Sequence, residues 1–232
     1  MSSHARISQR AYDAAKAAID ADDLDALTPQ LARGSSPEGG WTALMYAAMT
    51  DKAAACERLL AEHGADPNHT NDHRGTALTV AARHGAAASL EVLLARGGDP
   101  FARDRDDRDA LLAAVCYDKR ACVELLMPRV VAAAGIDARD RDGATALHHA
   151  TTFAGLAMVD ALLERGADPD AAELSGYTPL HNAILRGDPA LVERLLAAGA
   201  RLTSILPDGR AVLEVVRTKR LRRLLARHLG GS

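Results

Sequence analysis

The sequence predicts an all-α chain built from repeated helical units. An anchor leucine followed by small residues recurs through most of the chain at intervals of 33 to 36 residues. The anchors are Leu44, Leu78, Leu111, Leu147, Leu180 and Leu213. Alanine supplies 49 of the 232 residues, whereas phenylalanine, tryptophan and tyrosine together supply seven. A core of small and aliphatic side chains favours close helix–helix packing over a β-sandwich or barrel.

The composition indicates a folded chain and excludes several classes of protein. Hydrophobic residues make up 48% and charged residues 25%, which excludes wholesale disorder. The net charge of −3 gives no overall attraction to nucleic acid or an anionic membrane. Three cysteines without a CxxC pair, no apolar leader and no long apolar run favour a cytoplasmic protein without disulfides or membrane spans. Arginine outnumbers lysine 24 to 4, which together with the alanine content indicates a bacterial source.

Each repeat is expected to begin with a short helix that carries the anchor leucine. A hydroxyl two residues before the anchor is able to cap the exposed amides of a helix start, and Pro179 suits the first helical position. The capping threonines are Thr42, Thr76, Thr145 and Thr178, with Asp109 in the same role and Ala211 unable to fill it. Gly85 and Gly187 are expected to end this helix.

A second helix is expected to carry a pair of large apolar residues 15 and 16 residues after the anchor. It should end at a left-handed glycine, and a turn or hairpin should lead to the next repeat. The glycines are Gly64, Gly97, Gly135, Gly166 and Gly199. The repeat of residues 104–139 gains three residues around Pro128, which is expected to break or kink the second helix there. This insertion is interpreted as a tolerated surface change, with a purpose-built contact as the alternative.

These motifs resemble the ankyrin repeat. Its TPLH-type helix start appears as Thr178-Pro179-Leu180-His181 and, altered, as Thr145-Ala146-Leu147-His148, and its GAD turn appears at Gly64-Ala65-Asp66 and Gly166-Ala167-Asp168. The resemblance implies an all-α ankyrin-repeat solenoid of helix-turn-helix-hairpin units with N- and C-terminal capping repeats. The implied boundaries are 1–36 for the N-terminal cap, 37–70, 71–103, 104–139, 140–172 and 173–205 for the repeats, and 206–232 for the C-terminal cap.

The resemblance also implies where a partner would bind. In ankyrin repeats the variable contact positions are hairpin residues just before the first helix and residues at its end. We therefore expect a partner-binding surface of Trp41, Met49, His73, Arg83, His84, Arg105, Arg108, Tyr117, Arg141, Phe153, Tyr177 and Arg186. Four of the seven aromatic residues fall on it, and aromatic and arginine side chains are frequent hot spots. The alternative is that these rings only fill gaps between neighbouring repeats.

Other candidate sites are better explained by the repeat. The acidic run Asp104–Asp109 coincides with a predicted hairpin tip, so we interpret it as a solvated turn. The histidines that follow the anchors, His148-His149 and His181, suggest metal ligands, but the resemblance implies that a histidine here bonds to a neighbouring hairpin. Zinc requires four ligands at defined spacing, and the sequence does not supply such a set. It also contains no nucleophile–base arrangement and no Gly-rich phosphate loop.

These observations predict a monomeric, non-catalytic protein-binding module without a cofactor, which inhibits, neutralises or escorts a partner protein. No nucleic acid and no membrane are expected as partners, because the predicted surface mixes both signs of charge. An alternative is a nucleic-acid or anionic-surface binder that uses the basic C-terminal cap, centred on Arg220, Arg222 and Arg223.

Overall fold

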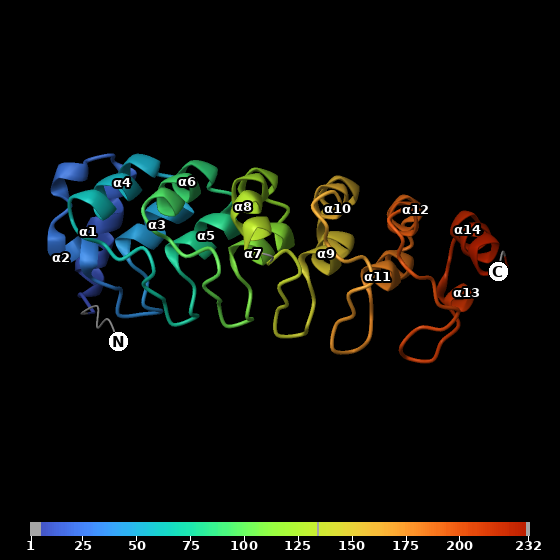
Figure 1. The fold of residues 1–232 in the computed structure, drawn as a ribbon. Coiled ribbons are helices and arrows are strands. Elements are labelled where there is room, and N and C mark those ends of the chain that lie inside the picture. Colours follow the sequence, from blue (N-terminus) through green and yellow to red (C-terminus); the bar gives the residue numbers. More distant parts are fainter. Residues whose placement is uncertain (1–5, 134, 231–232) are drawn as a thin grey trace. The chain divides into compact units, whose positions relative to one another are not determined.

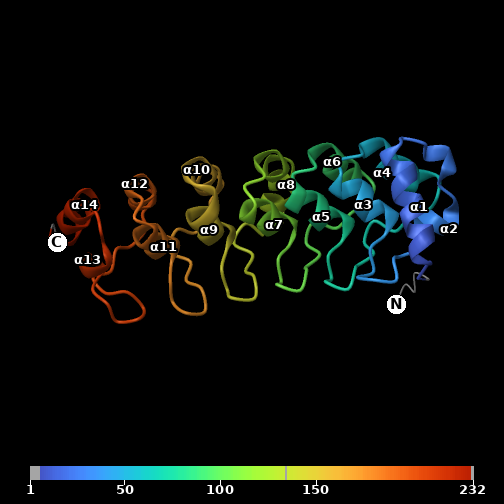
Figure 2. The ribbon, with the colours of Figure 1, turned by 180° about the vertical axis from the view of Figure 1, so that it is seen from behind.

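The structure, a computed structural model, describes residues 6–133 and 135–230. The chain divides into an N-terminal part, residues 1–114 and 119–129, and a C-terminal part, residues 115–118 and 130–232. Each part consists of helix pairs joined by long hairpin loops (Figure 1 and, from behind, Figure 2). Isolated β-bridges are the only extended pairings among the residues described, so the predicted all-α fold class is confirmed.

Within the N-terminal part the helices form two layers. The first helix α3 of one repeat packs on the first helix α5 of the next, and the second helices α4 and α6 pack on each other in the same way. In chain order these elements are α1 (Gln9–Asp20), the 3₁₀ turn η1 (Leu24–Ala26), α2 (Pro29–Arg33), α3 (Ala43–Met49), α4 (Ala53–Ala61), α5 (Ala77–His84) and α6 (Ala87–Ala95), followed by α7 (Ala110–Cys116) and α8 (Arg120–Ala132).

The C-terminal part repeats the arrangement with one irregular first helix. Here α10 packs on α12, while α11 packs on α9 and on the π-helical turn η2 that continues α9. The elements are α9 (Ala146–His149), η2 (Ala150–Ala154), α10 (Leu156–Leu163), α11 (Pro179–Arg186), α12 (Pro189–Ala197), α13 (Val212–Val215) and α14 (Lys219–Gly230). The last helix, α14, contacts α12 and α13.

The anchor leucines form the core of the first-helix layer. Leu78 and Leu147 are fully buried, and Leu44, Leu111 and Leu180 nearly so. Each such side chain contributes roughly 1.5–3 kcal/mol through loss of apolar surface to water. The last anchor, Leu213, is only half-buried. The first member of every apolar pair in the second helices is also fully buried, at Leu59, Leu93, Leu126, Leu162 and Leu195.

The helix ends follow the predicted capping chemistry. The Thr42 Oγ1 accepts a hydrogen bond from the Met45 amide at 3.2 Å, and the Asp109 Oδ1 accepts one from the Leu112 amide at 2.9 Å. Ala211 has no such bond, and its helix α13 is only four residues long. The glycines with positive φ after the helices include Gly64, Gly85, Gly97, Gly166, Gly187 and Gly199. The predicted stop at Gly135 adjoins residue 134, which lies outside the described residues.

Helix α8 continues past Pro128, so the predicted break at this residue was wrong. Helix α8 runs for 13 residues with Pro128 inside it, whereas α4, α6 and α12 have nine residues each. The three inserted residues extend the helix by about one turn. Because the Pro128 side chain is exposed, its ring displaces no core residue. The missing amide of Pro128 removes one backbone hydrogen bond without ending the helix.

Neighbouring hairpins are held in register by backbone hydrogen bonds. Within each part, an amide at one hairpin tip donates to a carbonyl of the preceding tip. The pairs are Asp72 to Gly39 at 2.9 Å, Arg105 to His73 at 3.0 Å and Leu174 to Asp142 at 3.0 Å. This ladder fixes the spacing of the residues that the hairpins present. Across the described ranges, no helix has the length and apolar character needed to span a membrane.

Candidate functional site

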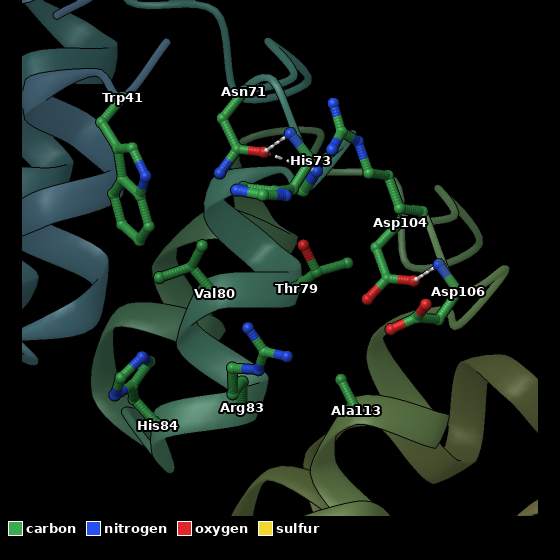
Figure 3. Close-up of a pocket in the computed structure, with 12 residues that line it drawn as sticks. Trp41, Asn71, His73, Thr79, Val80, Arg83, His84, Asp104, Asp106 and Ala113 are labelled. Atoms are coloured by element: carbon green, nitrogen blue, oxygen red, sulfur yellow. Dashed lines mark hydrogen bonds between the residues drawn. The ribbon is translucent and has the colours of Figure 1, made fainter. Parts of the chain in front are cut away.

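A pocket of about 400 Å³ lies in the N-terminal part, on the side of the hairpins and first helices (Figure 3). Three successive repeats contribute to it. Trp41 comes from the hairpin before α3, His73 and the end of α5 come from the repeat of residues 71–103, and Arg105 comes from the hairpin of the next repeat. Five of the twelve predicted binding residues therefore line one pocket: Trp41, His73, Arg83, His84 and Arg105.

The indole of Trp41 is half-buried and its hairpin is tightly held. The Trp41 amide donates to the Ser36 Oγ at 3.1 Å, and the Trp41 carbonyl accepts from the Ser36 amide at 2.7 Å. Gly39 has a φ of 73°, and a Cβ there would lie 3.2 Å from the indole Cδ1. A glycine is thus needed at this position both for the turn and for the ring that packs over it.

The cationic side of the pocket comes from α5 and from two hairpin tips. Arg83 and His84 form the last turn of α5, where cations are favoured by the helix dipole, and both are exposed. Burial, followed by the nearby charges of Arg83 and Lys119, lowers the pKa of His84. His73 and Arg105 are exposed on neighbouring tips and are linked by the backbone bond described above.

The acidic residues of the pocket already have partners on their own hairpin. The Asp104 Oδ1 accepts hydrogen bonds from the amides of Asp106 at 2.8 Å and Arg108 at 3.0 Å. The Asp106 carboxylate faces the Arg108 guanidinium at 3.8 Å. The acidic run therefore forms a turn, as predicted, and Asp109 adds a helix cap. Arg108 itself is half-buried and acts beside the pocket rather than in its wall.

The remaining walls were not predicted. Val80 and Ala113 both lie two residues after an anchor leucine and form part of the lining, together with Thr79 and Asn71. The sequence contained a signal for Val80 and Ala113, because both residues have the same spacing from their anchor leucine. Asn71 lies seven residues before its anchor and accepts from the amides of His73 and Gly75, both at 2.9 Å.

A second hollow of about 300 Å³ in the same part also has Trp41 in its lining. Met49, which was also predicted, lines it with Tyr12, Lys16 and Tyr46. The Lys16 ammonium lies 5.3 Å from the centre of the Tyr12 ring and 5.8 Å from that of Tyr46, within cation–π range. Trp41 thus lines both hollows.

In the C-terminal part the predicted residues have different surroundings. Tyr117, in the turn between α7 and α8, is 46% exposed, and Phe153 is 62% exposed. Arg141 is exposed at a hairpin tip. Tyr177 is half-buried, and a hydrogen bond to Asp208 raises the pKa of its hydroxyl. These four side chains line neither of the two hollows described above, whereas Arg186 lines a third hollow, of about 630 Å³, between α11 and α13.

Arg186 has a structural contact that sequence reasoning missed. Its Nη1 donates to the carbonyls of Thr151 at 3.0 Å and Thr152 at 3.1 Å, in the π-helical turn η2. In that turn the Gly155 amide bonds to the Ala150 carbonyl five residues earlier, so the Thr151 carbonyl loses its usual helical donor, and the Thr152 carbonyl lies in the last turn, where helical donors run out. Arg186 supplies the replacement, and the turn carries the exposed Phe153.

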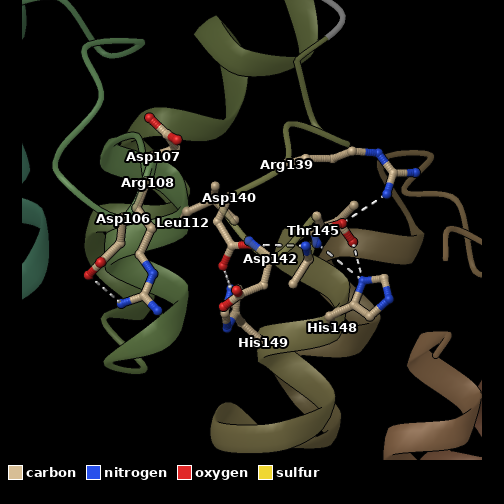
Figure 4. A network of polar contacts seen from close by, with 12 residues as sticks. Asp106, Asp107, Arg108, Leu112, Arg139, Asp140, Asp142, Thr145, His148 and His149 are labelled. Atoms are coloured by element: carbon tan, nitrogen blue, oxygen red, sulfur yellow. Dashed lines mark hydrogen bonds and ion pairs between the residues drawn. The ribbon is translucent and has the colours of Figure 1, made fainter. Parts of the chain in front are cut away.

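The histidines after the anchors are structural, as the resemblance implied (Figure 4). The His148 Nδ1 accepts from the Thr145 amide at 3.1 Å, and its Nε2 lies 3.1 Å from the Tyr177 carbonyl. An amide only donates and a carbonyl only accepts, so His148 is neutral with its proton on Nε2. Burial lowers the pKa of His148 in agreement with this state. His181 repeats the contact with Thr178 at 3.1 Å.

His149 has a different role that was not predicted. Its Nε2 donates to the Asp140 Oδ2 at 2.8 Å, with both side chains largely buried. The other oxygen of Asp140 accepts from the amides of Asp142 at 3.0 Å and Ala144 at 2.9 Å (Figure 4). Asn71, Asp104 and Asp140 thus hold three hairpin turns in the same way, each seven residues before an anchor leucine.

Among the residues described, the structure groups no set of metal ligands and buries two of the three thiols. In the part of the chain that is described, no three His, Cys, Asp or Glu side chains cluster as metal ligands. Cys56 and Cys122 are buried thiols, and burial raises their pKa to about 12 and about 11. The arrangement presents an exposed surface of fixed hairpins and short helices.

These features define a helical repeat protein whose hairpins and first helices form an exposed contact surface. The sequence profile for ankyrin repeats (3 copies) matches residues 13–104, 89–173 and 111–205. The chain therefore belongs to the ankyrin-repeat family, as the sequence motifs predicted. Ankyrin repeats are in general protein–protein interaction modules and non-catalytic binding scaffolds.

A comparison with solved structures found a similar domain. It is described as "Crystal structure of the ankyrin repeat domain of Bcl-3: a unique member of the IkappaB protein family". The sequences are 30% identical, the match covers 91% of this chain and 97% of that chain, and the TM-score is 0.75. A comparison with curated proteins gave no match.

Proposed function

We propose that this chain is a non-catalytic module that binds a partner protein on the surface formed by its hairpins and first helices. The observation that carries the proposal is the pocket of about 400 Å³ in the N-terminal part. Five residues chosen from the sequence alone converge there from three repeats. Its volume falls within the range of about 300–1,000 Å³ that is typical of ligand sites.

The exposure of the aromatic side chains supports the proposal. Phe153 and Tyr117 have 62% and 46% of their surface in contact with solvent, which does not favour a role as fillers between repeats. Trp41 and Tyr177 are half-buried, so they combine a fixed orientation with an accessible face. Rigid, partly exposed aromatic rings are frequent anchors in protein interfaces.

The proposed mode of action is occlusion or escort of the partner. A standard interface buries about 1,200–2,000 Å² in total, which is enough to cover a functional surface of a small protein. The mixture of positive and negative side chains on the hairpins suits a protein partner with matched charges. We propose that the module acts as a cytoplasmic monomer and inhibits, neutralises or escorts its partner.

The test is a pull-down from a lysate of the source cells with the wild-type chain and a Trp41/Tyr117/Phe153 triple alanine variant. The proposal predicts that the wild type retains a defined partner and that the triple variant loses it. Phe101→Ala is the matched control, because Phe101 is 41% exposed but lies outside the predicted surface. Circular dichroism must show that both variants keep the wild-type helical content.

Capture that is equal for the wild type and the triple variant would contradict the proposed surface. Loss of capture with Phe101→Ala alone would also contradict it, since the effect would then not be confined to the predicted positions.

A second candidate function uses α14 as an anionic-surface or nucleic-acid contact. This helix contains five Lys or Arg residues and no acidic residue, and the guanidinium groups of Arg222, Arg223 and Arg227 belong to exposed side chains. Its apolar residues Leu221 and Leu225 are buried against the stack, so they are not available to insert into a membrane. Salt-sensitive binding to generic DNA or acidic liposomes that is lost in an Arg222/Arg223 glutamate variant would support this candidate.

A further inference from the structure

We propose that the pocket between Trp41 and Arg105 accepts a side-chain carboxylate, from Asp or Glu, of an extended partner segment, with a neighbouring apolar side chain of that segment packed on the indole. This inference rests on the proposed function and adds the chemistry of the residue that the pocket recognises.

The first argument is the state of Arg105. Its side chain is exposed at a hairpin tip and lines the pocket. Its backbone amide is fixed by the bond to the His73 carbonyl at 3.0 Å, so the tip itself is well positioned. Over residues 6–133 and 135–230, no carboxylate lies within ion-pair distance of its guanidinium. Because the hairpin tip is fixed, the N–H groups of the Arg105 guanidinium are well placed to donate to both oxygens of a carboxylate.

The second argument is that the nearby carboxylates are already satisfied. Asp104 accepts from two backbone amides, and Asp106 faces Arg108. Asp72, on the neighbouring tip, pairs with Arg6 at 3.2 Å. These acidic groups therefore offer little attraction for a cation, while Arg83 and Arg105 add positive charge to the lining.

The third argument is the electrostatic environment at the other end of the pocket. Lys119 lies against Gly85, immediately after His84. Burial first, and then the charges of Arg83 and Lys119, lower the pKa of His84, and these two cationic side chains make the potential at this end positive. A negative group placed between His84 and Arg105 reduces this repulsion.

The fourth argument concerns the uncharged walls. The Trp41 ring, Val80 and Ala113 provide apolar surface beside the cationic groups. A ligand that uses both kinds of wall must carry a charge next to an apolar group. A carboxylate fits better than a phosphate dianion, because the imidazoles of His73 and His84 are not permanent charges and the pocket lining holds two arginines against two aspartates.

The experiment is a selection of random dodecapeptides displayed on phage against the immobilised full chain. The proposal predicts enrichment of peptides that carry Asp or Glu beside an apolar residue. The Arg105→Glu variant should select peptides without this acidic bias. Arg10→Glu is the matched control, since Arg10 is exposed on α1 outside the pocket, and it should select the same peptides as the wild type.

Affinities of an enriched peptide are then measured through the fluorescence of Trp41, the only tryptophan in the chain. Replacing its acidic residue by the amide should weaken binding by about tenfold, the loss expected for one charge-assisted hydrogen bond. High salt should weaken the acidic peptide more than the amide peptide. Arg105→Gln should reduce the affinity of the acidic peptide alone, without the repulsion that glutamate introduces.

Three results would overturn the proposal: enrichment without acidic residues or no enrichment at all, equal affinity of acid and amide peptides, or unchanged affinity with Arg105→Gln. A phosphoserine peptide that binds at least tenfold more tightly than the carboxylate peptide would instead assign the pocket to phosphate. The two proposals fail separately. If the lysate partner is lost with the triple alanine variant while the peptides show no acidic bias, the contact surface stands and only the carboxylate pocket is wrong.

Discussion

Replacement of Asp140 tests whether the hairpin turns limit the stability of the C-terminal part. The carboxylate accepts three hydrogen bonds: from the Asp142 and Ala144 amides at 3.0 and 2.9 Å, and from the His149 ring at 2.8 Å. At about 1–1.5 kcal/mol for each, Asp140→Ala should lower the free energy of unfolding by roughly 3–4 kcal/mol. Asp140→Asn keeps the oxygen that binds both amides and should cost about a third of this.

The measurement is urea unfolding followed by circular dichroism at neutral pH, with hydrogen exchange of the Asp142 and Ala144 amides as a local readout. Asn71→Ala is the matched comparison, because Asn71 makes the same two backbone bonds without an imidazole partner. It should cost about 2 kcal/mol. An Asp140→Ala variant that loses less than about 1 kcal/mol, or no more than Asn71→Ala, would refute the reasoning.

Three further results are expected. Because burial lowers the pKa of His148 below 6.5, the unfolded chain binds more protons at acidic pH, so the free energy of unfolding should fall as pH drops below about 6.5 and should fall less in His148→Gln. A thiol reagent at pH near 8 should label Cys116 but not Cys56 or Cys122 until denaturant is added. Pro128→Ala should stabilise the chain by about 1–3 kcal/mol in urea unfolding, because it restores a helical amide at an exposed position.

Much of the fold was predictable because the repeat couples local and long-range signals. A threonine or aspartate cap, a buried leucine and a terminal glycine each specify part of a helix, and their recurrence at a constant period specifies stacking. The break predicted at Pro128 does not occur, because the proline lies on an exposed side of a helix that runs on to Ala132. Whether a proline is tolerated in a helix depends on which side of the helix packs against the core, and a short segment of sequence does not show this.

The candidate site was predictable only in part. Trp41, His73, Arg83, His84 and Arg105 were predicted from their distances to the anchors, and the structure places them in the lining of one pocket. The hydrogen-bond and ion-pair partners of these side chains could not be predicted, because they depend on side-chain geometry. Arg186 is an example, since its contact with two carbonyls exists only because the preceding first helix ends in a π-helical turn.

That π-helical turn adds one residue between the anchor and the glycine that ends the first helix. Leu147 and Gly155 are eight positions apart, whereas Leu78 and Gly85 are seven apart, yet the distance from Leu147 to the next anchor, Leu180, remains 33 residues. The extra residue is compensated in the short link before α10, so the following repeats keep their phase. A longer first helix and a shorter link thus place the exposed Phe153 on this turn without changing the interval to the next anchor.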